Sequence, residues 1–273
     1  MFIGTNVYGW RQIAQREERE FDRARAMADA AAAGLTGWED LFRSPDGVAQ
    51  VVADAEAAGL EMRSAYVCGS FHTEERAKIS SDTALEIVGA LMPHGVTKFI
   101  SNPDPLPGGA LKSDDALRVQ RDAFETLGHQ VKAMGAELLY HAHAPEMLGS
   151  AREYHHMLAA TDPAAVGLCL DVHWVWRGAG NSMIALEDII RLYAGRVSEL
   201  HLRQSQDGIW AETVEDGDLD LVRVAEMLSE RDVKALVVLE HAYEEDTPKR
   251  RETVEAHAAS RSYAASHFAK IAL

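Results

Sequence analysis

Strand-like and helix-like segments alternate along the whole chain, and this alternation constrains the fold more than any other feature. Eight short apolar segments have the composition of strands, at residues 2–10, 35–41, 61–68, 96–101, 137–143, 166–171, 197–203 and 235–240. A helical pattern follows each of them without a linker or a change in composition. Eight such units in 273 residues predict an α/β fold with one domain, residues 1–273, closed into a (β/α)8 barrel.

The composition limits the classes of partner that such a barrel can bind. The formal net charge is −16, and an acidic surface repels phosphate backbones and anionic lipid head groups. We therefore expect neither a nucleic-acid nor a membrane partner, and no apolar run approaches the roughly 18 residues of a membrane span. The first residues lack the basic and apolar segments of a secretory signal, and the two cysteines, Cys68 and Cys169, lie far apart. These features predict a cytoplasmic protein.

The fifth predicted strand leads into LLYHAHAPE, residues 138–146, which is rich in polar groups. Residues two apart in a strand share a face, so His141 and His143 are expected to point the same way. Pro145 ends the strand, which puts Glu146 in the loop at its carboxyl end, where ligands collect in parallel α/β folds. Taken alone, the segment is equally compatible with two buried, hydrogen-bonded histidines followed by a helix cap.

The next three predicted strands also end in side chains that can bind a metal. Asp171 lies in LCLDVHW, His201 in ELHLR and Glu240 in VVLEH. Because the carboxyl ends of barrel strands meet at one mouth, these three side chains and Glu146 are expected to come together. Three carboxylates and one imidazole favour one divalent metal ion, Mn²⁺ first, with Mg²⁺, Co²⁺ or Zn²⁺ as alternatives. The competing interpretation is a ring of ordinary polar residues, but four consecutive strand ends of this kind favour the metal.

With these residues the chain resembles the xylose-isomerase-like TIM-barrel superfamily of sugar isomerases and epimerases, also described as the AP-endonuclease family 2 type. YHAHAPE is similar to its Tyr-His-Asn-His-x-x-Glu pattern, with Ala142 in place of Asn. DVHW and the following WRGAG are similar to its Asp-x-x-Trp and glycine-containing loop. LHLR resembles Leu-His-Leu-Lys with Arg203 in place of Lys, and the next residue is Gln204 rather than the common Asp. EDGDLD resembles Gly-x-Gly-x-Ile-Asp without the first Gly, and the resemblance covers nearly the whole chain.

The resemblance implies that one divalent metal is bound by four residues, Glu146, Asp171, His201 and Glu240. It also implies a sugar or keto-sugar isomerase or epimerase, in which Lewis-acid polarisation acidifies a C–H bond and stabilises the enediolate. Glu146 and Glu240 are the predicted acid–base pair that removes one proton and returns another. The same site would serve a lyase or dehydratase of a 3-keto-glycoside or an inosose, which stays open as the alternative.

Five further side chains are predicted to contact the substrate: His141, His143, His173, Trp174 and Arg203. His173 follows Asp171 on the same face, and Trp174 offers a wall for the C–H face of a sugar. Arg203 shares parity with His201 and can hold a ligand oxygen. A packed, structural role is the competing interpretation for each of them, above all for His141. Glu39, on the second predicted strand, is a weaker candidate for the site.

Two other function classes remain. A metal-dependent nuclease of abasic sites would share the barrel, but it needs a basic surface that this acidic chain lacks. A barrel without catalytic activity, or one that works only with a partner subunit, stays open, as does a homo-oligomer. No glycine-rich phosphate cradle is evident, which favours a small, unphosphorylated sugar as the partner.

Overall fold

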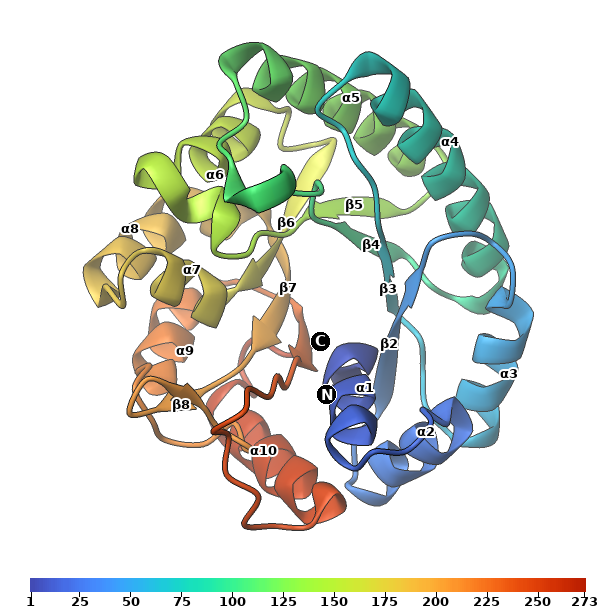
Figure 1. Ribbon diagram of the computed structural model, residues 1–273, viewed down its shortest axis with the longest axis vertical. Coiled ribbons are helices and arrows are strands. Elements are labelled where there is room, and N and C mark those ends of the chain that lie inside the picture. Colours follow the sequence, from blue (N-terminus) through green and yellow to red (C-terminus); the bar gives the residue numbers. More distant parts are fainter.

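Eight parallel strands form a closed barrel in the computed structural model, which describes residues 1–273 (Figure 1). Around the barrel the order is β1-β10-β7-β6-β5-β4-β3-β2. The bounds are Ile3–Asn6 (β1), Gly37–Phe42 (β2), Ser64–Val67 (β3), Lys98–Ser101 (β4), Glu137–Tyr140 (β5), Val166–Asp171 (β6), Val197–Leu202 (β7) and Leu236–Leu239 (β10). The predicted (β/α)8 TIM barrel is confirmed, with a strand in each of the eight predicted segments.

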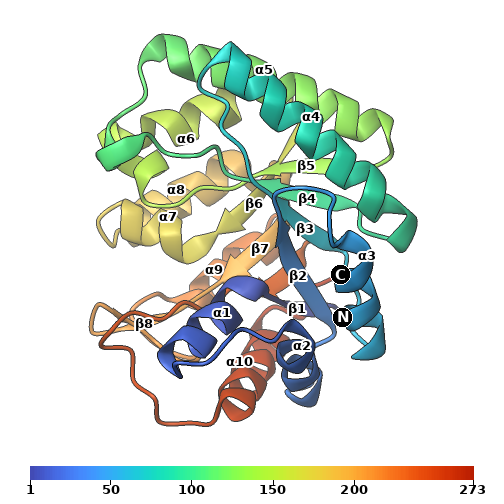
Figure 2. The same cartoon turned by 45° about the vertical axis from the view of Figure 1, so that its right-hand side comes forward.

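Helices surround the barrel and cover the outer face of its strands (Figures 1 and 2). Their bounds are Val7–Arg16 (α1), Arg23–Ala32 (α2), Val48–Ala57 (α3), Glu74–Leu91 (α4), Asp114–Ala133 (α5), Leu148–Ala160 (α6), Val172–Gly178 (α7), Met183–Tyr193 (α8), Leu221–Ser229 (α9) and Thr253–His267 (α10). The last helix, α10, packs against α2, and the Phe2 amide donates a hydrogen bond to the carbonyl of Leu273, so the two ends of the chain meet. None of the helices combines the length and apolar character that crossing a membrane requires.

Two helices lie where the sequence predicts none, and a side-chain cap explains each. The predicted first strand, residues 2–10, is wrong beyond Asn6, whose side chain accepts a hydrogen bond from the Tyr8 amide at 2.7 Å and starts α1. Asp171 does the same for α7, because its Oδ1 accepts from the Trp174 amide at 2.7 Å. Strand therefore passes into helix at both positions without a connecting loop.

Two further boundaries differ from the prediction. Strand β5 ends at Tyr140 rather than at residue 143; the His141 amide still donates to the Ser101 carbonyl at 3.0 Å. The chain then enters a short 3₁₀ turn, Pro145–Met147 (η3). The sequence pattern predicts a long polar insertion at residues 69–81 with the next helix beginning at residue 83; helix α4 instead begins at Glu74, capped by Thr73. A small hairpin of Ser205–Gln206 (β8) and Ile209–Trp210 (β9) follows β7.

The barrel interior is layered from apolar to polar. Phe2, Leu236 and Val238 fill its amino-terminal end, and a second apolar layer of Tyr66, Ile100, Leu139 and Cys169 lies above them. Gly37 makes room for this packing, because a Cβ atom there would lie 2.1 Å from the Phe2 ring. Apolar side chains thus fill much of the amino-terminal part of the barrel, and polar side chains gather from the level of Glu199 to the carboxyl-terminal mouth.

Candidate metal centre and active site

Strand register brings the predicted ligands of β6, β7 and β10 together. His201 on β7 is paired with Asp171 on β6 and with Val238 on β10. Glu240 is two residues beyond Val238 and therefore faces the same interior. The structure adds His141, just after β5, so that His141, Asp171, His201 and Glu240 each offer a ligand atom within 4.8 Å of the others. We call these four residues the ligand group.

The imidazole nitrogens of the ligand group are buried and lie beside carboxylates without a hydrogen bond of good geometry. His141 Nε2 lies 3.8 Å from Asp171 Oδ2, and His201 Nδ1 lies 3.5 Å from Glu240 Oε2. Both ring nitrogens of each histidine lack a hydrogen-bond partner. Because buried polar atoms normally have partners, unpaired imidazole nitrogens beside two carboxylates fit a divalent cation. The donor set is two imidazoles and two carboxylates, against the three carboxylates and one imidazole expected from the sequence.

Glu146 lies outside the ligand group. It is buried in η3, and its Oε2 accepts a hydrogen bond from the His143 amide at 2.7 Å. Burial raises the pKa of Glu146 to about 7. The chain leaves β5 after His141, which directs the Glu146 carboxylate to the backbone of its own turn. His141 is the fourth member of the ligand group, and the role of Glu146 as a metal ligand stays a prediction.

Two buried carboxylates lie beneath His201. Its Nε2 is 3.2 Å from Glu39 Oε1 and 3.4 Å from Glu199 Oε1. Asn6 donates a hydrogen bond to Glu39, and the Ser64 hydroxyl lies between the two carboxylates, 3.0 Å from Glu39 and 2.9 Å from Glu199. Burial and the Glu39 charge raise the pKa of Glu199, whereas His201 lowers that of Glu39 against the effect of burial. The two carboxylates, whose pKa values are shifted in opposite directions, support the His201 ring from below.

Arg203 lies above the ligand group between two tryptophans. Its guanidinium is 5.1 Å from the Trp174 ring and 4.9 Å from the Trp210 ring, a cation–π arrangement. Nη2 donates to Glu240 Oε2 at 2.5 Å and lies 3.5 Å from Asp171 Oδ2. Burial alone would raise the pKa of Glu240, but Arg203 and His201 hold it well below its usual range. Glu240 is therefore ionised at neutral pH.

A cavity of about 370 Å³ opens over this group at the mouth of the barrel. Such a volume suits a small molecule. We call it the site cavity; its lining residues are Asn6, Tyr8, Leu41, Arg43, Tyr66, Cys68, Asn102, Asp104, His143, Trp174, Arg203 and Glu240. They come from all eight strands or the segments that follow them, so the cavity is built by the barrel mouth as a whole.

The predicted substrate contacts divide into three kinds. His143, Trp174 and Arg203 line the site cavity. Burial and the neighbouring His141 lower the pKa of His143 to about 3, and the Asn102 amide lies 3.2 Å from its Nδ1. His141 belongs to the ligand group instead. His173 belongs neither to the wall of the site cavity nor to the ligand group. Its Nε2 instead lies 3.0 Å from the Ser205 hydroxyl.

The sequence did not reveal several polar residues of the cavity wall, among them Asn6, Tyr66 and Asn102. Asn6 ends β1, Tyr66 lies in β3 and Asn102 follows β4, each on the inward-facing parity of its strand. The position of each residue in or just after its strand therefore indicated that its side chain faces the barrel interior. This position alone did not identify them as site residues, because amide and phenol side chains are common at strand ends that belong to no site.

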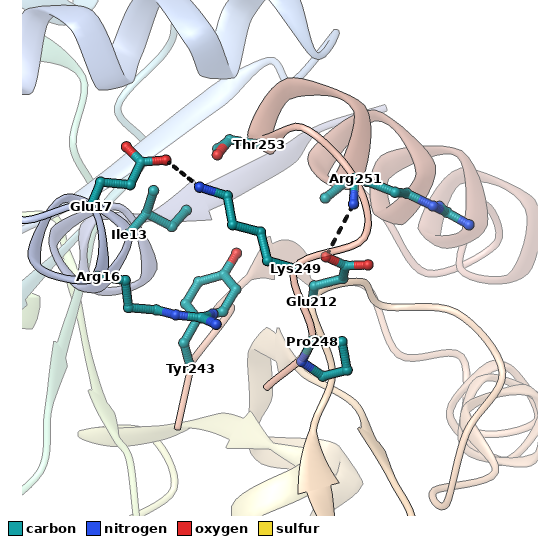
Figure 3. Close-up of a pocket in the computed structure, with 10 residues that line it drawn as sticks. Ile13, Arg16, Glu17, Glu212, Tyr243, Pro248, Lys249, Arg251 and Thr253 are labelled. Carbon is teal, nitrogen blue, oxygen red and sulfur yellow. Dashed lines mark hydrogen bonds and ion pairs between the residues drawn. The ribbon is translucent and has the colours of Figure 1, made fainter. Parts of the chain in front are cut away.

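A separate hollow lies between α1 and the start of α10, and Figure 3 shows its walls. Its volume is about 30 Å³, which is room for about two water molecules. Arg16 stacks on Tyr243 and donates to the Thr247 carbonyl, and Lys249 is paired with Glu17 at 3.0 Å. With its cations occupied and so little space, this hollow joins the first and last units of the barrel and offers no second substrate site.

The family model described as xylose isomerase-like TIM barrel matches residues 27–263. Among solved structures, a sugar phosphate isomerase/epimerase from Parabacteroides distasonis has 18% identity and a TM-score of 0.73, with 96% of each chain covered. A D-allulose 3-epimerase from Methylomonas sp. has 14% identity and a TM-score of 0.73, over 98% of this chain and 97% of its own. A 3-keto-D-glucoside 4-epimerase from E. coli has 15% identity and a TM-score of 0.68, over 97% of this chain and 99% of its own. No curated protein matches the sequence.

Proposed function

We propose, from the premise that the chain belongs to the xylose isomerase-like TIM-barrel family, that it is a divalent-metal-dependent isomerase or epimerase of a sugar or keto-sugar. The observation that carries this proposal is the convergence of the four members of the ligand group beneath a cavity of about 370 Å³. The similar solved structures support the substrate class, because they include two sugar epimerases and a sugar phosphate isomerase/epimerase.

The ligand group would hold one divalent ion. A set of two imidazoles and two carboxylates suits Mn²⁺, Co²⁺ or Zn²⁺ better than Mg²⁺, which prefers oxygen donors. Mn²⁺ remains the first candidate because both carboxylates are hard oxygen ligands. A bound divalent ion supplies Lewis-acid polarisation of a substrate carbonyl.

Two carboxyl groups with separated pKa values would move the proton. Glu240 lines the site cavity and is ionised, so it is the candidate base for the C–H next to the carbonyl. The pKa of Glu146 is raised to about 7 by burial, which is suited to proton exchange near neutral pH. Glu146 lies behind the His143 backbone rather than on the cavity wall, so its place in the pair is the part of this proposal that mutation tests most directly.

The cavity wall would orient the sugar. Trp174 offers its ring to the C–H face, while Arg203 and the neutral His143 offer hydrogen bonds to oxygens. The partner is a small-molecule sugar, and the two free thiols, Cys68 and Cys169, agree with a cytoplasmic location.

The test uses purified protein freed of metal with a chelator. Adding Mn²⁺ should raise its melting temperature, because a ligand that binds only the folded state stabilises it by about 2.7 kcal/mol at 100 times its Kd. Incubating the Mn²⁺-loaded protein with ketoses and 3-keto-sugars in D₂O should place deuterium on the carbon next to the carbonyl. No metal-dependent shift and no deuterium incorporation from any substrate would overturn the proposal.

The products separate this reaction from its runner-up. An isomerase or epimerase returns a proton and yields a sugar of unchanged mass apart from deuterium. A lyase or dehydratase acting on a 3-keto-glycoside or an inosose would release the group β to the carbanion. Mass spectrometry of the same incubations therefore distinguishes the two, and loss of an alcohol or water would move the assignment to the lyase.

A further inference from the structure

A second hollow adjoins the site cavity and belongs to the same mouth of the barrel. Its volume is about 410 Å³, and it shares Arg43, Cys68 and Asp104 with the site cavity. We call it the side pocket; α4 forms its outer wall through Arg76, Ser80 and Thr83. Each of the two spaces exceeds the roughly 300 Å³ at which small-molecule pockets begin. A ligand held in the site cavity therefore has an adjoining space of similar size.

The wall between the two spaces is fixed by hydrogen bonds. The Ser80 hydroxyl accepts from the Ser70 amide at 2.9 Å and donates to the Ser70 carbonyl at 3.0 Å. The Ser70 hydroxyl donates to Asp104 at 2.6 Å, and the Asp104 amide donates to the Gly69 carbonyl at 2.9 Å. A Cβ atom on Gly69 would lie 2.7 Å from the Ser80 Cβ, so the loop after β3 rests directly on α4. The side pocket is thus shaped before any ligand arrives.

The chemistry of the side pocket suits a neutral polyol. Two guanidinium groups, of Arg43 and Arg76, face two carboxylates, of Glu75 and Asp104, so the formal charges cancel. Neither guanidinium has a hydrogen-bond or ion-pair partner in the protein, and both remain free to bind hydroxyl groups. The exposed side chain of Ile79 adds an apolar surface. Donors, acceptors and a small apolar face are what a sugar ring requires, whereas an anionic substituent would meet a chain of net charge −16.

The position of the side pocket suggests different roles for the two spaces, with the reacting carbons in the site cavity and a substituent in the side pocket. Strand β3 lies across the barrel from β7, which carries His201. A sugar whose reacting carbons face the ligand group would therefore direct a substituent on its far side toward Cys68 and the side pocket. We infer that the side pocket is a second sugar subsite, so that the preferred substrate is a keto-sugar carrying a glycosyl group rather than a free monosaccharide. This inference rests on the proposed function.

The experiment compares matched pairs of substrates on the Mn²⁺-loaded protein. The pairs are D-fructose with lactulose or isomaltulose, and 3-keto-D-glucose with 3-keto-trehalose, with deuterium incorporation from D₂O as the assay. We expect the glycosylated member of at least one pair to have a KM about tenfold lower with a similar kcat. Arg76→Ala and Thr83→Val should each reduce this preference severalfold. Arg25→Ala, on the exposed face of α2, is the control and should leave the preference unchanged.

A binding measurement makes the result independent of turnover. Trehalose, which has no keto group to react, should bind the Mn²⁺-loaded protein in calorimetry and bind Arg76→Ala more weakly. Equal KM values within every pair, together with trehalose binding that Arg76→Ala does not change, would overturn the subsite and leave the proposed function standing. Absence of exchange with every keto-sugar would instead overturn the proposed function, and an Arg76-dependent affinity for trehalose would then still support the subsite.

Discussion

The Nε2 atom of His201 lies 3.2 Å from Oε1 of Glu39, on the side of the ring away from Glu240. The other ring nitrogen, Nδ1, is 3.5 Å from Glu240 Oε2 and is the one that faces the ligand group. A carboxylate on the far nitrogen of a metal-binding histidine sets the orientation of its ring and raises its basicity. Glu39 is itself held by the Asn6 amide, so the orientation of His201 is determined by β1 and β2 as well as by β7.

Replacing this carboxylate should weaken metal binding without removing a ligand. For Glu39→Gln we expect a loss of roughly 10- to 100-fold in Mn²⁺ affinity, measured by titration with electron paramagnetic resonance. Asp40→Asn is the matched control, because Asp40 is the next residue of β2, equally buried, and is paired with Arg23 outside the barrel. Its metal affinity should stay within about twofold of the parent. An unchanged affinity in Glu39→Gln would mean that His201 is oriented by other groups.

Two single substitutions decide which residue completes the ligand group. His141→Gln should lower Mn²⁺ affinity by at least 100-fold, because it removes a buried nitrogen that has no other partner. Glu146→Gln should leave the affinity within severalfold of the parent, since the amide oxygen still accepts the hydrogen bond from His143. Calorimetric titration of both variants gives the comparison. The reverse order of effects would restore Glu146 as the ligand.

The barrel was predictable because its signals are local and repeated. Every strand is a short, largely buried segment, and one residue more or less at an end does not alter the fold. The convergence of Asp171, His201 and Glu240 followed from their places at the ends of adjacent strands, because parallel register fixes neighbours. A sequence pattern read along β6, β7 and β10 is therefore enough to bring these side chains to one mouth.

The place of His141 in the ligand group was not predictable in the same way, and the role of Glu146 as a ligand stays a prediction. The place of His141 depends on where β5 leaves the sheet, which is set by the last hydrogen bond of the ladder, from His141 to Ser101. The His141 imidazole faces the barrel axis, whereas the turn that follows directs the Glu146 carboxylate to the His143 amide. Helix α1 escaped prediction for a similar reason, because a single capping contact from Asn6 converts an apolar strand-like run into a helix.

Glu146 should also make stability depend on pH. Its pKa is about 7 in the folded chain against an ordinary value of 4.5, so the folded state binds the proton more tightly than the unfolded state. The contribution of Glu146 to the stability of the metal-free protein should therefore fall as pH rises from about 4.5 to about 7, and should stay level above that. The buried charge costs about 3 kcal/mol at pH 8. Glu146→Gln should then be more stable than the parent at pH 8 and about as stable as the parent near pH 4.5.

Urea unfolding of the metal-free protein at intervals between pH 5 and pH 8 measures this difference. The exposed Glu245→Gln variant is the control, and its stability should differ from the parent by a constant amount across the range. A Glu146→Gln curve that also runs parallel to the parent would show that Glu146 titrates at an ordinary pKa. The same variant should lose most isomerase or epimerase activity at pH 7, because Gln cannot exchange the proton.

Arg203 places a fixed positive charge on the two carboxylates that a metal would share, through contacts of 2.5 Å to Glu240 and 3.5 Å to Asp171. Removing one partner of a buried ion pair typically costs about 3–5 kcal/mol, so metal-free Arg203→Met should melt well below the parent. Mn²⁺ would replace part of the missing charge, and its addition should raise the melting temperature more in Arg203→Met than in the parent. Arg196→Met, which removes an arginine bound to the Thr161 and Val166 carbonyls, should lower both melting temperatures equally. Equal Mn²⁺-induced shifts in all three proteins would separate Arg203 from the metal site and restrict it to packing between the tryptophans.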